Sequence, residues 1–206
     1  MEGQEYLDQI SATTLPTKSK GNFFKNKFFI IGTIAVTALL LFAVIIVALL
    51  GDDKTSEKSV SFALKLHLDY TESTIREYQP SVKSSILRGY SASLSSVLSN
   101  TNSTLTSYIT DKYKFKPKNV NKKTAAAAEK ASKELKDTLF EAKINGILDR
   151  IYTHKMIYET SSLMTEINKV IKATKNDGLK EALTSSYASI ENLHTQFSNY
   201  SETRKE

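Results

Sequence analysis

The sequence contains no cysteine, so neither a disulfide bond nor a lipid-modified cysteine can stabilise or anchor this chain. Helix-breaking residues are also scarce, with three prolines and seven glycines among 206 residues. A glycine-rich phosphate-binding loop and a Gly-x-Ser-x-Gly nucleophile motif are both absent. Stability must therefore come from a buried core, and the sequence offers no familiar motif for nucleotide binding or hydrolysis.

Charged residues are missing from one long segment, Phe28–Leu50, which is mostly apolar. As a helix it would span about 34 Å, enough to cross a hydrocarbon core of about 30 Å. A cleaved signal peptide is the alternative, but its apolar stretch is usually about 7–15 residues and ends in a small-residue cleavage pattern. The segment is longer than that and lacks the pattern, which favours an uncleaved transmembrane anchor in contact with the lipid bilayer.

Positive charge lies mainly on the N-terminal side of this segment. The lysines that precede it, with no acid among them, are Lys18, Lys20, Lys25 and Lys27. Because positive charge resists translocation, the N-terminus should stay in the cytosol and the rest should be extracytoplasmic. We therefore expect a single-pass protein of the cytoplasmic membrane, divided into a short disordered cytosolic tail (1–27), the anchor (28–50), a juxtamembrane linker (51–58) and a helical bundle (59–203).

Every apolar pattern after the linker has the period of a helix, and no segment alternates as a strand would. Four breaks divide the pattern, at Gln79-Pro80, Lys116–Asn119, Asn145-Gly146 and Asn176–Gly178. The resulting five helices have short connections, which predicts an all-α fold of antiparallel helices. The core should contain the apolar stripe of each helix, Ile86 included, with the tyrosines at the core edge or, alternatively, on a binding surface.

The net charge is +6, and the basic residues beyond the anchor look scattered among acids, as at Lys130 and Glu134. A nucleic-acid interface would cluster basic residues and interleave aromatic ones. We therefore interpret the charge as a solvated helix surface, with a weak attraction to anionic surfaces as the alternative. Besides the bilayer, we expect an envelope protein or a second copy of the chain as the partner, and no nucleic acid.

Three histidines are present, His67, His154 and His194, and only one follows an acid at a spacing of three. Glu191 and His194 would share one face of a helix, as the ligands of di-iron bundles do. Such sites need that motif twice and a glutamate from each of two further helices, and no second copy exists here. Two interpretations stay open: His194 lies at the rim of the core, or Glu191 and His194 bind a metal ion.

One heptapeptide carries a family resemblance. Residues Gly146–Tyr152 read Gly-Ile-Leu-Asp-Arg-Ile-Tyr at the start of the fourth helix, and His194 lies late in the next. This resembles a ferritin-like family of bacterial envelope proteins of unknown function, in which Gly-x-x-Phe-Asp-Arg-x-Tyr opens one helix, although here one residue rather than two follows the glycine before Leu148. Leu148 replaces the phenylalanine, and the histidines of the family's second and fourth helices have no counterpart. The tail, anchor and tyrosine-rich bundle also resemble single-pass envelope proteins of small-genome candidate-phylum bacteria.

These observations predict a non-enzymatic interaction or structural module of the cell envelope, without a cofactor. The alternative is a ferritin-like metal-binding or redox protein holding iron, manganese or zinc. Its ligands would be Glu191 and His194, helped by Glu159, Glu141 or Asp149. We also expect the helix before Gly146 to end or bend there, and Asp149 to lie in the first turn of the next helix, where a carboxylate is favoured.

Overall fold

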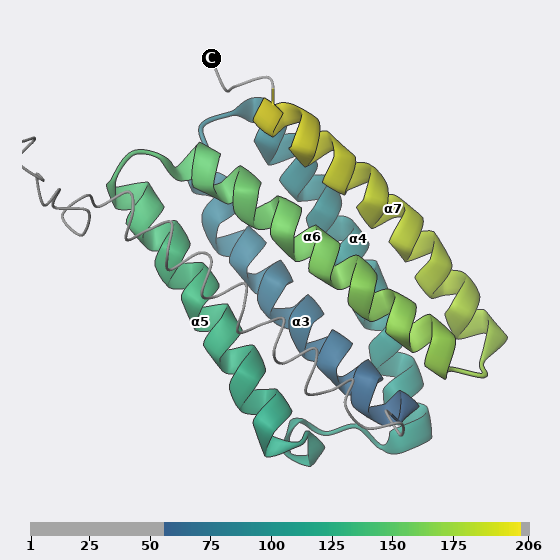
Figure 1. Ribbon diagram of the computed structural model, residues 1–206. Helices are drawn as coiled ribbons and strands as arrows, with labels where there is room; N and C mark the ends of the chain where they lie inside the picture. Colours follow the sequence, from purple (N-terminus) through teal and green to yellow (C-terminus); the bar gives the residue numbers. More distant parts are fainter. Residues whose placement is uncertain (1–55, 203–206) are drawn as a thin grey trace, which may run out of the picture. The chain divides into compact units, whose positions relative to one another are not determined.

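A computed structural model describes residues 56–202, and every regular element within them is a helix (Figure 1). Five α-helices span Glu57–Tyr78 (α3), Ser85–Tyr113 (α4), Lys122–Ile144 (α5), Leu148–Ala173 (α6) and Asp177–Glu202 (α7). Two short 3-10 helices lie in connections, Gln79–Ser81 (η2) and Pro117–Asn119 (η3). The prediction of an all-α fold with five helices is confirmed for the described residues.

The predicted tail 1–27, the anchor 28–50 and residues 51–55 of the linker lie outside the described residues. The end of the linker is helical, because α3 already begins at Glu57. Among residues 56–202, no helix is both long enough and apolar enough to cross a membrane.

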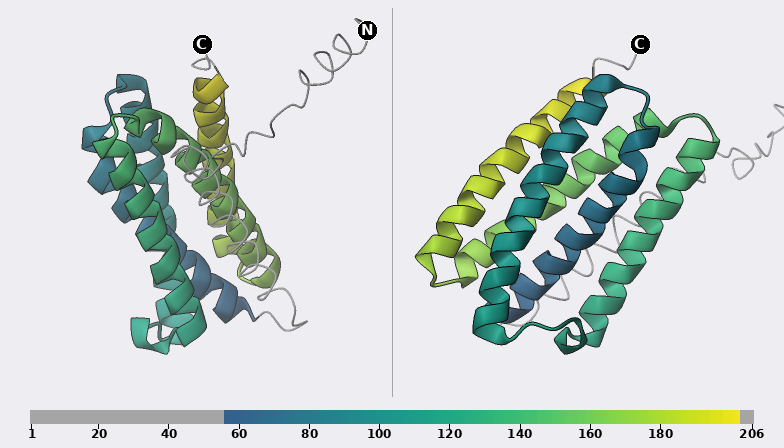
Figure 2. Two further views of the ribbon diagram at one scale, coloured as in Figure 1. Left: turned by 60° about the vertical axis from the view of Figure 1, so that its left-hand side comes forward. Right: turned by 180° about the vertical axis from the view of Figure 1, so that it is seen from behind.

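Four of the helices form the bundle and the fifth packs on its side. α3 contacts α4 and α6, and α7 contacts the same two helices, so the four surround one core. α5 packs against α3 and α6 (Figures 1 and 2). Consecutive helices run antiparallel, which brings distant segments together at two ends. We call one the Ser56 end, with the α4–α5 and α6–α7 connections, and the other the Asp149 end, with the α3–α4 and α5–α6 connections and the end of α7.

Short polar side chains explain where several helices begin. Ser56 accepts a hydrogen bond from the Ser59 N–H (3.3 Å) at the start of α3, and Ser84 accepts one from the Leu87 N–H (3.4 Å) at the start of α4. At α7, the Asn176 side chain accepts from the Leu179 N–H (2.7 Å). The predicted turn at 176–178 is therefore wrong in part, because this cap lets the helix begin at Asp177.

The apolar stripes meet in one core that includes Leu64, Leu94, Leu139, Leu163 and Phe197. Ile86 was expected there but is 54% exposed. It lies in the first turn of α4, which begins at Ser85, and in that turn Leu87 is the residue buried in the core. Most tyrosines within residues 56–202 are half-buried, as their core-edge placement predicts, but Tyr70, Tyr78 and Tyr152 are buried, and Tyr152 is 0% exposed.

Candidate functional site

The heptapeptide Gly146–Tyr152 forms the corner between α5 and α6. Gly146 has φ +72°, a left-handed conformation that glycine adopts without strain. Its N–H donates to the Lys143 carbonyl (3.2 Å), and the Ile147 N–H donates to the Ala142 carbonyl (3.0 Å). These two bonds are the pattern of a Schellman C-cap. The prediction that a helix ends at Asn145-Gly146 is therefore confirmed.

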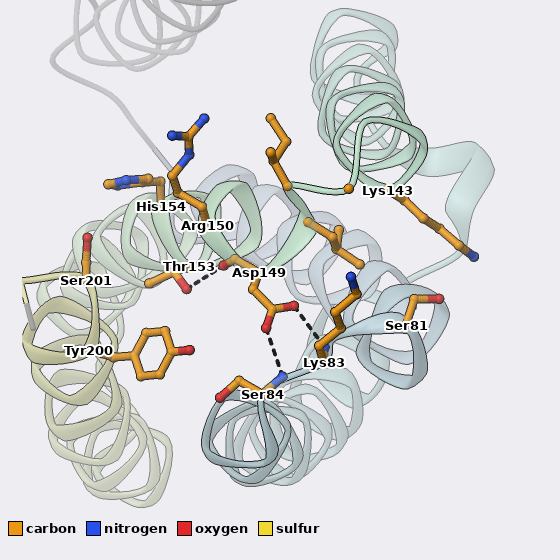
Figure 3. Close-up of a pocket in the computed structure, with 13 residues that line it drawn as sticks. Ser81, Lys83, Ser84, Lys143, Asp149, Arg150, Thr153, His154, Tyr200 and Ser201 are labelled. Atoms are coloured by element: carbon orange, nitrogen blue, oxygen red, sulfur yellow. Dashed lines mark hydrogen bonds between the residues drawn. The ribbon is translucent and has the colours of Figure 1, made fainter. Parts of the chain in front are cut away.

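Asp149 lies in the first turn of α6, as predicted, but its carboxylate serves a different helix. Oδ1 accepts a hydrogen bond from the Lys83 N–H and Oδ2 accepts one from the Ser84 N–H, both at 2.8 Å (Figure 3). These donors belong to the residues just before α4, whose first N–H groups have no partner within the helix. The side chain therefore caps α4 from a position 65 residues away in sequence. We call Asp149 with its two donors the Asp149 corner.

A groove of about 950 Å³ opens beside this corner, between the starts of α4 and α6 and the end of α7 (Figure 3). Its lining includes the nitrogen-bearing side chains of Lys83, Lys143, Arg150 and His154. The single carboxylate in the lining, Asp149, has both oxygens bonded to backbone N–H groups.

The two residues proposed from sequence as metal ligands lie on α7. Glu191 is exposed. His194 is half-buried, and its Nδ1 lies 3.0 Å from Thr160 Oγ1 and 3.1 Å from the Ile157 carbonyl oxygen. Of the acids that were expected to help them, Glu141 is exposed on α5 and Asp149 caps α4. The third, Glu159, points to a different histidine.

That histidine, His67 on α3, is 2% exposed and lies between two carboxylates of α6. Its Nε2 is 2.9 Å from Glu159 Oε2, and its Nδ1 is 3.1 Å from Glu166 Oε2. Glu159 is also buried, with 5% exposed. We call these three residues the His67 cluster. It ties α3 to α6 near the middle of the bundle, through side chains about 90 residues apart.

Further side chains of α3 complete this cluster. The Tyr70 and Thr71 hydroxyls donate to the same Glu159 oxygen, at 3.3 and 3.4 Å. The Tyr70 ring also stacks on the His67 ring, with centroids 4.8 Å apart. Burial by itself would lower the pKa of His67, but the charge of Glu166 and the hydrogen bond to Glu159 raise that pKa to about 10. The imidazole is therefore a cation at neutral pH.

The geometry of the His67 cluster suits an ion pair better than a metal site. A metal ion binds one ring nitrogen and needs its other ligands on the same side. Here the two carboxylates lie at opposite nitrogens of one ring. Within residues 56–202, no group of three or more histidine, aspartate or glutamate side chains is placed to hold a metal ion.

A second group of polar contacts between helices lies at the Ser56 end, around Glu57. Its carboxylate accepts hydrogen bonds from the Tyr108 hydroxyl, from the Thr174 hydroxyl (2.9 Å) and from the Lys112 ammonium (2.9 Å). Burial would raise the pKa of Glu57, but the hydrogen bonds from Tyr108 and Lys112 hold it below its usual value. The first turn of α3 is thus joined to α4 and to the α6–α7 connection.

Two features were not predicted, although the sequence contains evidence for them: the burial of His67 and a cluster of lysines. His67 falls on the apolar stripe of its helix, between Leu64 and Leu68, where a buried position is expected. The basic residues were interpreted as scattered, yet residues 112–123 contain six lysines and no acid. What the sequence cannot show is that Glu159 and Glu166 face His67, since helix pairing decides that.

Comparison with known proteins adds no identification: no protein-family model, curated protein or solved structure matches this chain. The function must therefore be argued from the chain itself.

Proposed function

We propose that this chain is a single-pass, membrane-anchored protein whose extracytoplasmic helical bundle is a non-enzymatic interaction or structural module of the cell envelope. The anchor is the apolar segment Phe28–Leu50, and the lysines before it set the orientation. The resemblance of Gly146–Tyr152 to ferritin-like envelope proteins supports the same location and implies no known reaction.

One observation carries the non-enzymatic part of this proposal. The buried and half-buried carboxylates that join distant segments use their oxygens to bond other helices. Glu159 bonds His67, Asp149 bonds the backbone before α4, and Glu57 bonds Tyr108 and Lys112. Catalytic groups need to reach a substrate, whereas these groups are engaged in holding the bundle together.

Topology is tested by adding protease to spheroplasts that express the full chain. We expect digestion of the bundle and protection of the N-terminal tail. Protection of the bundle, with cleavage of the tail instead, would contradict the orientation.

The metal-binding alternative is tested by elemental analysis of the full chain, purified in detergent without chelator. We expect no stoichiometric iron, manganese or zinc. A stoichiometric metal that is lost in His194→Ala but kept in His154→Ala, a variant at an exposed histidine, would overturn the non-enzymatic proposal in favour of a metal or redox protein.

A further inference from the structure

Five exposed lysines lie within ten residues at the Ser56 end, where α4 is followed by η3 and α5 (Figure 1). They are Lys114, Lys116, Lys118, Lys122 and Lys123. We call residues 114–123 the lysine segment. No acidic residue occurs between Lys112 and Ala128, so the segment has no opposite charge next to it in sequence.

The lysine segment is held against the bundle by its apolar residues. The Phe115 ring packs edge-to-face on Phe62 of α3, with centroids 4.8 Å apart, and Val120 is buried. The chain turns sharply at Lys114, whose φ is +53°. The lysines are therefore presented from a fixed backbone, which lowers the entropy lost when they meet a charged surface.

Other charges at the Ser56 end leave it strongly basic. Lys58 and Lys175 are exposed there as well. Glu57 is paired with Lys112 at 2.9 Å. The exposed acids near this end are Asp111, Asp177 and Glu181, and Asp177 lies 3.5 Å from Lys180.

Chain connectivity keeps this basic end close to the proposed membrane. The apolar segment ends at Leu50, six residues before Ser56. A chain covers at most about 3.6 Å per residue, so Ser56 lies within roughly 22 Å of the end of the anchor. The Asp149 end lies at the other end of α4, which has 29 residues and is about 43 Å long, a length that exceeds the reach of this linker.

We propose that the lysine segment binds the anionic phospholipid headgroups of the membrane that holds the anchor, so that the bundle stands with its Ser56 end on the lipid surface. This inference rests on the proposed anchor. Each lysine close to an anionic membrane surface increases the binding constant about fivefold. The attraction fades within a Debye length of about 8–10 Å, so it acts on the end that the linker keeps near the membrane.

The aromatic residues of this region favour lipid over nucleic acid. Single-stranded nucleic acids bind basic grooves by stacking their bases on exposed aromatic faces. Here the Tyr113 and Phe115 rings both pack edge-to-face on Phe62, at 6.2 and 4.8 Å. The rings that alternate with the lysines are half-buried against α3, and the lysines remain for a charged surface.

The test uses the full chain in vesicles and takes advantage of its lack of cysteine, which makes single-cysteine labelling specific. A fluorophore is placed at Asn119→Cys in the lysine segment or at Ser85→Cys at the far end of α4, both exposed positions. The vesicles are phosphatidylcholine, or an equal mixture of phosphatidylcholine and phosphatidylglycerol, and carry headgroup nitroxides as quenchers. We expect stronger quenching of the Asn119→Cys probe in the anionic vesicles, reversed by salt, and little quenching of the Ser85→Cys probe.

Matched charge variants assign the effect to the segment. The triple variant Lys116→Gln, Lys118→Gln and Lys122→Gln removes three lysines from it. The control variant Lys83→Gln, Lys133→Gln and Lys143→Gln removes three exposed lysines elsewhere and leaves the same net charge. In the anionic vesicles, the ratio of docked to undocked chains should fall on the order of a hundredfold in the first variant and stay unchanged in the control.

The outcomes separate this inference from the proposed function. A chain that alkaline carbonate extracts from the vesicles would overturn the anchor, and the inference with it. An inserted chain whose probes respond equally to both lipids, or whose two triple variants behave alike, would overturn the inference and leave the anchor intact. Binding of a single-stranded oligonucleotide that displaces the lipid contact at equal phosphate concentration would also overturn it.

Discussion

The His67 cluster and the Asp149 corner both join distant segments through carboxylates of α6, but they do so in different surroundings. In the cluster, charged side chains of both partners lie inside the bundle, where His67 is 2% exposed. At the corner, a half-buried carboxylate at the end of the bundle accepts from two backbone N–H groups.

Similar bonds cost different amounts of stability when they are broken in these two surroundings. A charge left in the core without its partner loses both the pair and its hydration, so the penalty is large. Backbone N–H groups left at a helix start near the surface can be satisfied by water. We therefore expect the cluster to be the more sensitive of the two, and the following variants test that order.

The largest effect should come from His67→Gln, which removes the cation that both Glu159 and Glu166 contact. Breaking a buried ion pair in this way costs about 3–5 kcal/mol in the free energy of unfolding. Urea denaturation of the purified chain, followed by circular dichroism, measures it. His154→Gln at an exposed position is the control and should change stability by less than about 0.5 kcal/mol. Equal effects of the two variants would show that the cluster contributes nothing.

The pH dependence of stability separates charge from packing in the same cluster. The pKa of His67 is raised from 6.5 to about 10, so the folded chain keeps a proton that the unfolded chain releases. Its contribution to stability is therefore complete below about pH 6.5 and is lost as the pH rises through about 10. The difference in unfolding free energy between the unmodified chain and His67→Gln should shrink by a few kcal/mol over this range. A difference that does not change with pH would mean that His67 acts by packing alone.

A smaller effect is expected at the corner. Asp149→Ala removes two hydrogen bonds to a charged acceptor, and because the site is half-buried the loss should be about 1–3 kcal/mol with the fold retained. Asp149→Asn keeps one carbonyl acceptor and should recover part of the loss. Urea denaturation compares the three chains. A loss larger than that of His67→Gln would reverse the order that the comparison predicts.

The smallest effect concerns the backbone of the same corner. A methyl group at Gly146 would meet no atom within 4 Å, so Gly146→Ala should cost only the strain of a positive φ, about 1 kcal/mol. Gly89 is equally open but lies inside α4 without a positive φ, so Gly89→Ala should stabilise by about 0.5–1 kcal/mol. Thermal unfolding should move in opposite directions for the two variants, and a shift of the same sign would contradict the conformational explanation.

Local chemistry made several features of this fold predictable. Pro80 has no backbone N–H to continue a helix, and α3 ends at Tyr78, two residues before it. Gly146 adopts the left-handed conformation that closes a helix, and Asp149 falls in the first turn that follows. Ile86 shows the limit of such patterns, since it fits the apolar period but lies in the exposed first turn of α4.

The partners of the polar residues were not predictable in the same way. Glu159 was considered as a ligand beside His194, and it contacts His67 on another helix instead. The sequence placed Asp149 at a helix start, but the N–H groups that it caps precede a different helix. Such contacts depend on which helix faces which, and helix period contains no information on that choice.

Neighbouring residues in the sequence are enough to predict the helical class, most helix boundaries, the apolar stripes, the charge of the lysine segment and the apolar segment Phe28–Leu50. The three-dimensional arrangement of the helices was needed to show that His67 carries a buried charge between Glu159 and Glu166, and that Asp149 caps α4. Both depend on packing between helices, which brings residues about 65 to 90 positions apart within hydrogen-bond distance and removes water from around them.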